Sequence, residues 1–190
     1  MKTIRELTAE IRDINVEKGW RPAEGGPGEN TWGDYVALLH SEVSEMLEAY
    51  RDYRLEDGTV YCGAGENPKP EGVGAEAADV LIRLLDMCDV FDIEPFDMDM
   101  ELPDVSPALT TPGDLESFGD RVTWLHGIIT YMGRSAGGEG TPALVLRALV
   151  AVCEHYGIDL AAECERKIAY NRTRAFQHGG RTLAGNPRSA

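Results

Sequence analysis

The sequence predicts an all-α protein organised as a four-helix bundle. Apolar residues recur at intervals of three and four through six separate segments, which is the spacing of amphipathic helices. Gly- and Pro-rich stretches separate those segments. Two of the resulting helical hairpins resemble each other in sequence, and two hairpins packed face to face make a four-helix bundle. We expect a single domain over residues 1–190.

The expected helices follow in chain order from their apolar stripes. Ile4, Leu7 and Ile11 define one face of a first helix at about 3–17. Thr31 suits the N-cap of the second helix. Further helices are expected at about 75–91, 115–132, 141–155 and 160–173, with loops at 57–74 and 92–112 and no strand.

An internal repeat relates residues 33–40 to 119–126, where Gly-Asp, Val and Leu-His recur at the same places. The apolar spacing of 81–93 recurs in the same way at 146–158. Amphipathic helices resemble one another by default, but the Gly-Asp and Leu-His elements are not core positions that periodicity would force. We expect a metal-binding hairpin at 31–94, a degenerate second hairpin at 115–159, and a basic helix and tail at 160–190.

Composition excludes several classes of protein. The chain has 43% hydrophobic residues and a net charge of −15, so it should fold and should repel nucleic-acid polymers. It has no run of 18 apolar residues and no apolar stretch at its start, so we expect neither a membrane span nor a signal peptide. The expected location is the cytoplasm. Cys88 and Cys153 lie in apolar helical patterns and should be buried thiols, whereas Cys62 lies in a Gly-rich stretch and is a candidate for exposure.

Two acid pairs are candidates for metal ligation: Glu42 with Glu45, and Glu76 with Asp79. Residues at i and i+3 project from one helical face, and Glu42 borders the apolar stripe of its helix. If the two helices pack antiparallel, the four carboxylates converge and require a cation to offset their repulsion. Oxygen ligands of this charge suit Mg²⁺ or Mn²⁺.

Acid pairs at this spacing are common by chance. With 33 acids in the chain, random placement gives roughly six of them. Their ordinary interpretation is a solvated helix face, which we expect for Asp86, Asp89 and Asp92. The context of the two candidate pairs therefore matters more than their spacing.

Three elements together resemble the MazG-like, all-α nucleoside triphosphate pyrophosphohydrolase superfamily, in the style of actinobacterial and phage proteins. They are E-x-x-E within 39–51, E-x-x-D within 76–83, and K-x-x-x-N-x-x-R within 167–174, followed by His-Gly-Gly at 178–180. They occur in the family's order and span most of the chain. The resemblance implies a MazG-like bundle that hydrolyses a nucleoside triphosphate to a monophosphate and pyrophosphate with Mg²⁺.

The resemblance also implies roles for individual residues. Glu42 or Glu45, where not fully used in ligation, would accept the proton of the attacking water. Lys167, Asn171 and Arg174 are spaced by four and three residues and so share one helical face, which agrees with phosphate binding. A basic helix end that complements the helix dipole explains the same pattern. The implied metal ligands are Glu42, Glu45, Glu76 and Asp79, and the implied phosphate or sugar contacts are Lys167, Asn171 and Arg174.

Recognition of the base is left open by the sequence. Trp20 and Trp32 flank a Gly-rich loop before the second expected helix. Either ring can stack on a base, or close the end of the bundle. Asn15 and His40 are further candidates because they lie nearby in the sequence.

The second hairpin lacks the acids of the first: the corresponding positions hold Ile128, Tyr131, Thr141 and Leu144. We therefore expect one metal site per chain, with the second half replacing the second subunit of a simple dimer. Both a pseudo-dimeric monomer and a homodimer fit this pattern. The separation of Glu45 from Glu76 is longer than is common in the family. The alternative to an enzyme is a non-catalytic helical module, derived from this family, that binds a nucleotide or a protein.

Overall fold

Six α-helices make up most of the residues that the computed structural model describes, so the all-α expectation is confirmed. The structure describes residues 2–24, 26, 30–53, 55, 58–63, 67–94, 97–105, 115–135 and 141–176. Residues 177–190 of the expected basic tail, including the His-Gly-Gly element at 178–180, lie outside the described residues. The helices are α1 (Ile4–Glu17), α2 (Trp32–Asp52), α3 (Val73–Val90), α4 (Phe118–Arg134), α5 (Thr141–His155) and α6 (Leu160–Thr173).

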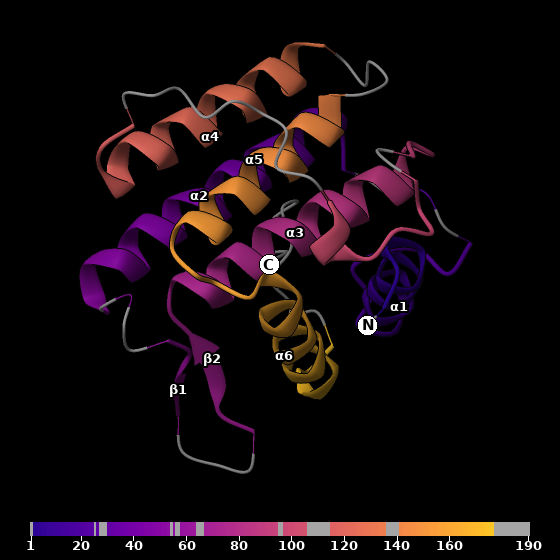
Figure 1. The fold of residues 1–190 in the computed structure, drawn as a ribbon. Helices are drawn as coiled ribbons and strands as arrows, with labels where there is room; N and C mark the ends of the chain where they lie inside the picture. The colour runs from indigo at the N-terminus through magenta and orange to yellow at the C-terminus, as the bar shows by residue number, and fades with distance from the viewer. Residues whose placement is uncertain are drawn as a thin grey trace, which may run out of the picture.

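Four of these helices form a closed ring of contacts. Helix α2 packs on α3 and α4, and α5 packs on α4 and α3. The result is a four-helix bundle made from the hairpins α2–α3 and α4–α5 (Figure 1). Helix α3 is the most enclosed because α1 and α6 also pack against it, and its apolar residues accordingly cover most of its circumference.

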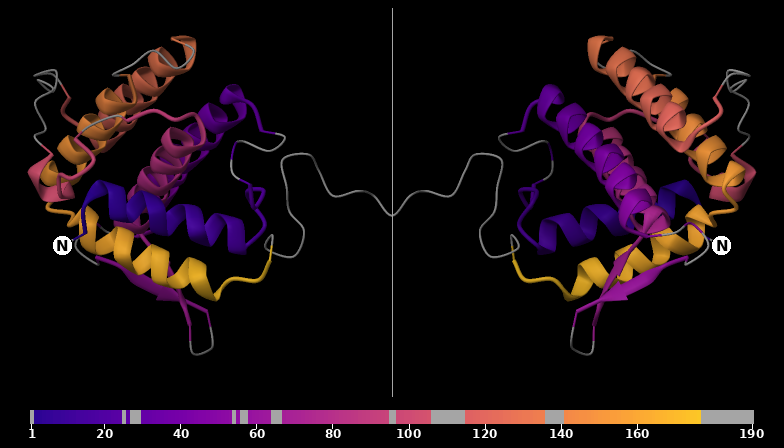
Figure 2. Two further views of the ribbon diagram at one scale, coloured as in Figure 1. Left: turned by 90° about the vertical axis from the view of Figure 1, so that its right-hand side faces the viewer. Right: turned by 90° about the vertical axis from the view of Figure 1, so that its left-hand side faces the viewer.

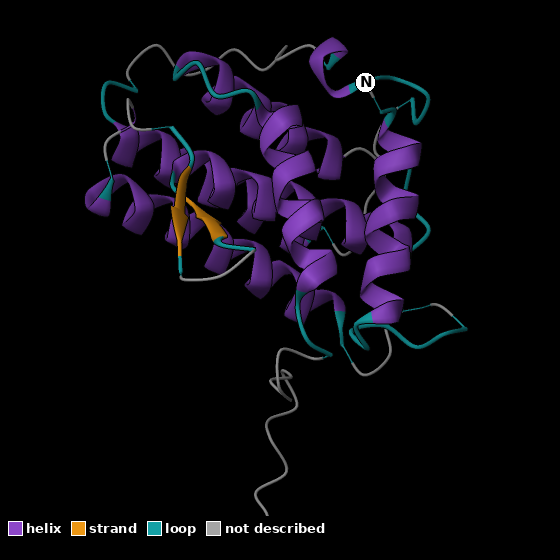
Figure 3. Cartoon of the chain, turned by 90° about the horizontal axis from the view of Figure 1, so that it is seen from below, coloured by secondary structure: helices purple, strands orange, loops and turns teal. Residues whose placement is uncertain are grey.

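Helices α1 and α6 lie side by side across one side of the bundle, where both pack against α3 (Figures 2 and 3). Glu10 of α1 links them, since its carboxylate accepts hydrogen bonds from Lys2 and Arg172, each at 2.6 Å. The C-terminal ends of both helices therefore reach the same region beside α3. No described helix is both long and apolar enough to span a bilayer.

Capping boxes explain part of the sequence repeat. At the start of α2, Thr31 and Asp34 cap each other, and the Asp34 carboxylate accepts from the Thr31 N–H at 2.7 Å. Ser117 and Asp120 do the same at the start of α4, at 2.8 Å. The Gly-Asp element of each half is thus part of a helix start. It also places the beginning of α4 after Ser117, later than the expected start near 115.

The two hairpins make matching contacts at corresponding positions. Trp32 packs edge-on against Phe91, with ring centroids 5.1 Å apart, and Phe118 packs against Tyr156 at 5.3 Å. The turn after each second helix is closed by an equivalent backbone bond. Ile93 donates to the Cys88 carbonyl at 2.8 Å, and Ile158 donates to the Cys153 carbonyl at 2.9 Å.

The expectation of no strand is wrong. Strands β1 (Val60–Cys62) and β2 (Lys69–Glu71) pair antiparallel within the expected loop at 57–74. Each has three residues and β2 contains Pro70, so neither offers the alternation from which a strand is predicted. The expected loop at 92–112 also contains a 3-10 turn, η2 (Leu102–Asp104).

The cysteines are free thiols, as expected. Cys88 and Cys153 are buried, and burial raises the pKa of each to about 12. Cys62 is half-buried in β1, with its Sγ 3.6 Å from the Tyr53 hydroxyl, and is therefore less open than the Gly-rich sequence indicated.

Candidate metal and phosphate site

A cavity of about 350 Å³ opens between the α2–α3 hairpin and the C-terminal ends of α1 and α6. Its walls come from five elements or their adjoining turns, and they combine acidic, basic and apolar side chains. The residues that line it are Ile14, Asn15, Lys18, Trp20, Glu42, Glu45, Lys69, Asp79, Ile82, Arg83, Asp86, Asn171 and Arg174.

Carboxylates from α2 and α3 converge beside this cavity. One oxygen each of Glu42, Glu45 and Glu76 lie within 4.8 Å of one another. The convergence follows from the i, i+3 spacing on two helices that pack as a hairpin. These three side chains supply the oxygen ligands that Mg²⁺ or Mn²⁺ prefers. The donor set thus fits a hard divalent cation.

Asp79, the fourth candidate, is held by a buried lysine. Lys167 of α6 places its Nζ 2.7 Å from an Asp79 oxygen and 3.6 Å from a Glu76 oxygen. The same ammonium donates to the Pro70 carbonyl at 3.4 Å, and the side chain is only 2% exposed. Lys167 therefore turns toward the acids and is not among the residues that line the cavity.

The negative charge of the cluster is only partly offset. Burial raises the pKa of Glu42, and the salt bridge from Arg83 Nε, at 3.0 Å, acts against that rise. Burial raises the pKa of Glu76 to about 7; Lys167 opposes this shift, and the neighbouring Asp79 charge adds to it. Glu45 is exposed, and Ser41 is its hydrogen-bond partner at 3.4 Å.

Basic and amide groups face the acids across the cavity. Lys69 comes from β2, whereas Asn171 and Arg174 come from the end of α6. Arg174 lies 5.8 Å from the Tyr170 ring centroid, and burial lowers the pKa of its guanidinium below the ordinary arginine value. An amide, a lysine and an arginine that line one cavity suit phosphate oxygens.

Arg83 and Lys69 lie among the charged residues of this site that were not predicted from the sequence. Arg83 follows Asp79 by four residues on α3, so helical spacing indicated that it shares the face of the acids, and its salt bridge is to Glu42 of α2. Lys69 carried no such signal, because it reaches the cavity through an unpredicted hairpin.

The expectation that Asp86 and Asp89 lie on a solvated helix face is wrong for Asp86. Asp86 and Asp89 were expected on a solvated face, but Asp86 is 5% exposed and lines the cavity. Arg21 bonds both acids from the α1–α2 connection, at 3.3 Å to Asp86 and 2.6 Å to Asp89. The exposure of Asp86 was predicted wrongly because α1 and its following turn cover this face of α3. Asp92 is exposed, as expected.

The four candidates for base contact separate in the structure. Asn15 and Trp20 line the cavity. Trp32 instead packs on Phe91 at the end of the bundle, and its indole N–H donates to the Gly133 carbonyl at 3.3 Å. His40 faces α4, so the structure brings neither Trp32 nor His40 to the cavity.

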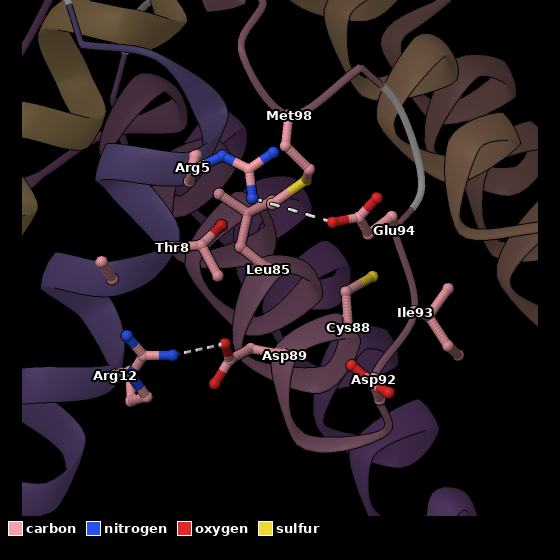
Figure 4. Close-up of a pocket in the computed structure, with 11 residues that line it drawn as sticks. Arg5, Thr8, Arg12, Leu85, Cys88, Asp89, Asp92, Ile93, Glu94 and Met98 are labelled. Carbon is pink, nitrogen blue, oxygen red and sulfur yellow. Dashed lines mark hydrogen bonds and ion pairs between the residues drawn. The ribbon is translucent and has the colours of Figure 1, made fainter.

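A second cavity, of about 300 Å³, lies between α1 and the end of α3 (Figure 4). Ion pairs join residues of its lining: Arg12 lies 3.0 Å from Asp89, and Arg5 lies 3.7 Å from Glu94. Cys88 contributes a buried thiol with a raised pKa. This cavity lacks the converging carboxylates of the first and is not our candidate site.

Comparisons of the chain with family models, with curated proteins and with solved structures gave no match.

Proposed function

We propose that the protein is a Mg²⁺-dependent nucleoside triphosphate pyrophosphohydrolase that releases pyrophosphate and a nucleoside monophosphate. One observation carries the proposal. A single cavity brings Glu42 and Glu45 of the acid cluster together with basic and amide groups from β2 and α6, which is the combination that a metal–triphosphate site needs. The MazG-like resemblance of the same acids and of the α6 residues agrees with it.

Glu42, Glu45 and Glu76 would hold Mg²⁺ or Mn²⁺, which would offset phosphate charge and lower the pKa of a coordinated water. Lys69 and Arg174 bind the phosphate oxygens, and Asn171 hydrogen-bonds the phosphate or the sugar. Arg83 holds Glu42 in place. Water attacks a phosphorus of the α–β anhydride, the P–O bond to the leaving group breaks, and a carboxylate accepts the water's proton. Glu45 suits this role because it is exposed.

The reaction class is tested by incubating the protein with deoxynucleoside triphosphates and Mg²⁺ and identifying the products. We expect pyrophosphate and monophosphate. Orthophosphate as the sole inorganic product would show that a different bond is cleaved.

The site is tested by Glu45→Gln, for which we expect at least about a hundredfold loss of kcat. Glu48→Gln is the matched control, because Glu48 is exposed on the same helix and does not line the cavity. Equal activity of both variants would remove Glu45 from the mechanism.

One observation favours a second candidate, a non-catalytic nucleotide-binding module. Lys167 and Arg83 already pair with Asp79 and Glu42, so cations of the chain itself stabilise part of the acid cluster. Calorimetry with Mg²⁺ and a non-hydrolysable deoxynucleoside triphosphate separates the two. Tight binding without turnover of the natural nucleotides favours the module.

A further inference from the structure

The cavity extends well beyond the acid cluster along α3. Asp79 and Asp86 both line it and are seven residues apart on the same helix. At a rise of 1.5 Å per residue they are separated by about 10 Å along the helix axis. A nucleotide with its phosphates at the Asp79 end would therefore place its base near Asp86.

The Asp86 end has the composition of a base pocket. The apolar side chains of Ile14 and Ile82 and the indole of Trp20 supply flat or hydrophobic surface for the faces of a base. Asn15 fixes the loop that carries Trp20, since its backbone carbonyl accepts from the Trp20 N–H at 2.8 Å.

Asp86 is the acceptor at this end. Its carboxylate accepts from Arg21 at 3.3 Å and from the Asn15 side chain. An ionised carboxylate has about four acceptor positions, so these two donors leave capacity for a ligand. Burial raises the pKa of Asp86, while the Asn15 hydrogen bond and the Arg21 charge act against that rise.

We propose that Asp86 is a specificity-determining residue that selects a nucleobase with adjacent N–H and NH₂ donors, the edge that guanine presents. The inference rests on the proposed function, because it takes the acid cluster as the phosphate end. Guanine offers two donors side by side to one carboxylate, whereas hypoxanthine offers one. Uracil and thymine offer one N–H between two carbonyl oxygens, which a carboxylate repels.

The first test needs no variant. Binding of the non-hydrolysable triphosphates of deoxyguanosine, deoxyinosine, deoxyuridine and thymidine is measured by calorimetry with Mg²⁺, together with turnover of the natural forms. We expect the guanine nucleotide to bind at least about tenfold more tightly than the hypoxanthine nucleotide, the worth of one hydrogen bond to a charged group. The uracil and thymine nucleotides should be weaker still.

The second test compares Asp86→Asn with Asp89→Asn. Both acids pair with Arg21, but Asp89 does not line this cavity, so Asp89→Asn controls for damage to the ion-pair network. We expect Asp86→Asn to abolish the guanine preference and Asp89→Asn to retain it.

These measurements distinguish a failure of the base-selection inference from a failure of the proposed function. Equal binding of the guanine and hypoxanthine nucleotides overturns this inference, as does a preference for uracil or thymine, while turnover still supports the proposed function. Binding of none of the nucleotides overturns both.

Discussion

Lys167 has the lowest exposure of the charged residues in the described part of the chain, and it holds two carboxylates of the candidate metal site. Its ammonium contacts Asp79, Glu76 and the Pro70 carbonyl. Removing one partner of a buried ion pair leaves the other charges uncompensated, which costs far more than losing a surface pair.

We predict that Lys167→Met destabilises the protein by about 3 kcal/mol in the absence of divalent cations. Arg172→Met is the control on the same helix, because its pair with Glu10 is half exposed and should contribute under about 1 kcal/mol. Urea unfolding with a chelator present measures both. Equal losses in the two variants would show that Lys167 does not stabilise the acid cluster.

At the scale of elements, the α2–α4 contact depends on a close approach at Gly133. A Cβ built at Gly133 would lie 2.9 Å from Val36 Cγ1. Valine is β-branched and stiff at χ1, so it cannot easily rotate away. Gly127, on the same helix, is exposed, and a Cβ there would meet no atom within 4 Å.

The two glycines should therefore respond to alanine with opposite signs. Alanine is favoured over glycine in a helix by about 1 kcal/mol, so Gly127→Ala should stabilise the protein by up to that amount. At Gly133 the overpacking cost of about 1–3 kcal/mol outweighs the same gain, and Gly133→Ala should be destabilising by about 1 kcal/mol. Denaturant midpoints measure both. Stabilisation by Gly133→Ala would show that the helices separate without cost.

At the scale of the whole molecule, a pair of histidines joins the two halves. His40 of α2 and His126 of α4 occupy the same place in the sequence repeat, and their rings stack with the Nδ1 atoms 2.8 Å apart. One Nδ1 must donate and the other accept, so at least one ring is neutral. Burial lowers the pKa of both, and the His40 charge lowers that of His126 further.

Stability should consequently fall as pH falls. The unfolded histidines take up protons near pH 6.5 and the folded ones resist protonation, so below that pH the unfolded chain binds more protons. The contribution is fully present above about pH 6.5 and is lost on acidification. Glu76, with a pKa raised to about 7, acts in the opposite direction.

The double variant His40→Gln/His126→Gln isolates the histidine effect from that of Glu76. We expect the unfolding free energy of the wild type to drop more steeply than that of the variant between pH 8 and pH 5.5. Parallel curves would contradict a role for the histidine pair in this pH dependence.

The helices, one helix cap and the convergence of three acids were predicted well from the sequence. Helix existence followed from apolar stripes, and Thr31 was identified as an N-cap because its side-chain chemistry is local. The acid convergence of Glu42, Glu45 and Glu76 followed from spacing plus one assumption about antiparallel packing. These features depend on contacts within one element or between chain neighbours.

Features that depend on contacts between residues distant in sequence were not predictable. The burial of Asp86 depends on Arg21, 65 residues away, and that of Lys167 on the β2 carbonyl of Pro70, 97 residues away. Lys69 required a strand pair too short to show alternation. Spacing on a helix gives the face of a residue, but not which other element covers that face.

The position of Trp20 has a practical consequence for experiments. The chain has three tryptophans, and Trp20 lines the candidate cavity, whereas Trp32 and Trp124 pack against the core. Indole emission responds to the polarity and quenching groups around the ring, so a base stacked on Trp20 should change the intrinsic fluorescence. A Trp20→Phe variant should lose that change while keeping the emission of the other two. The protein thus contains its own optical reporter of ligand occupancy, and no dye need be attached.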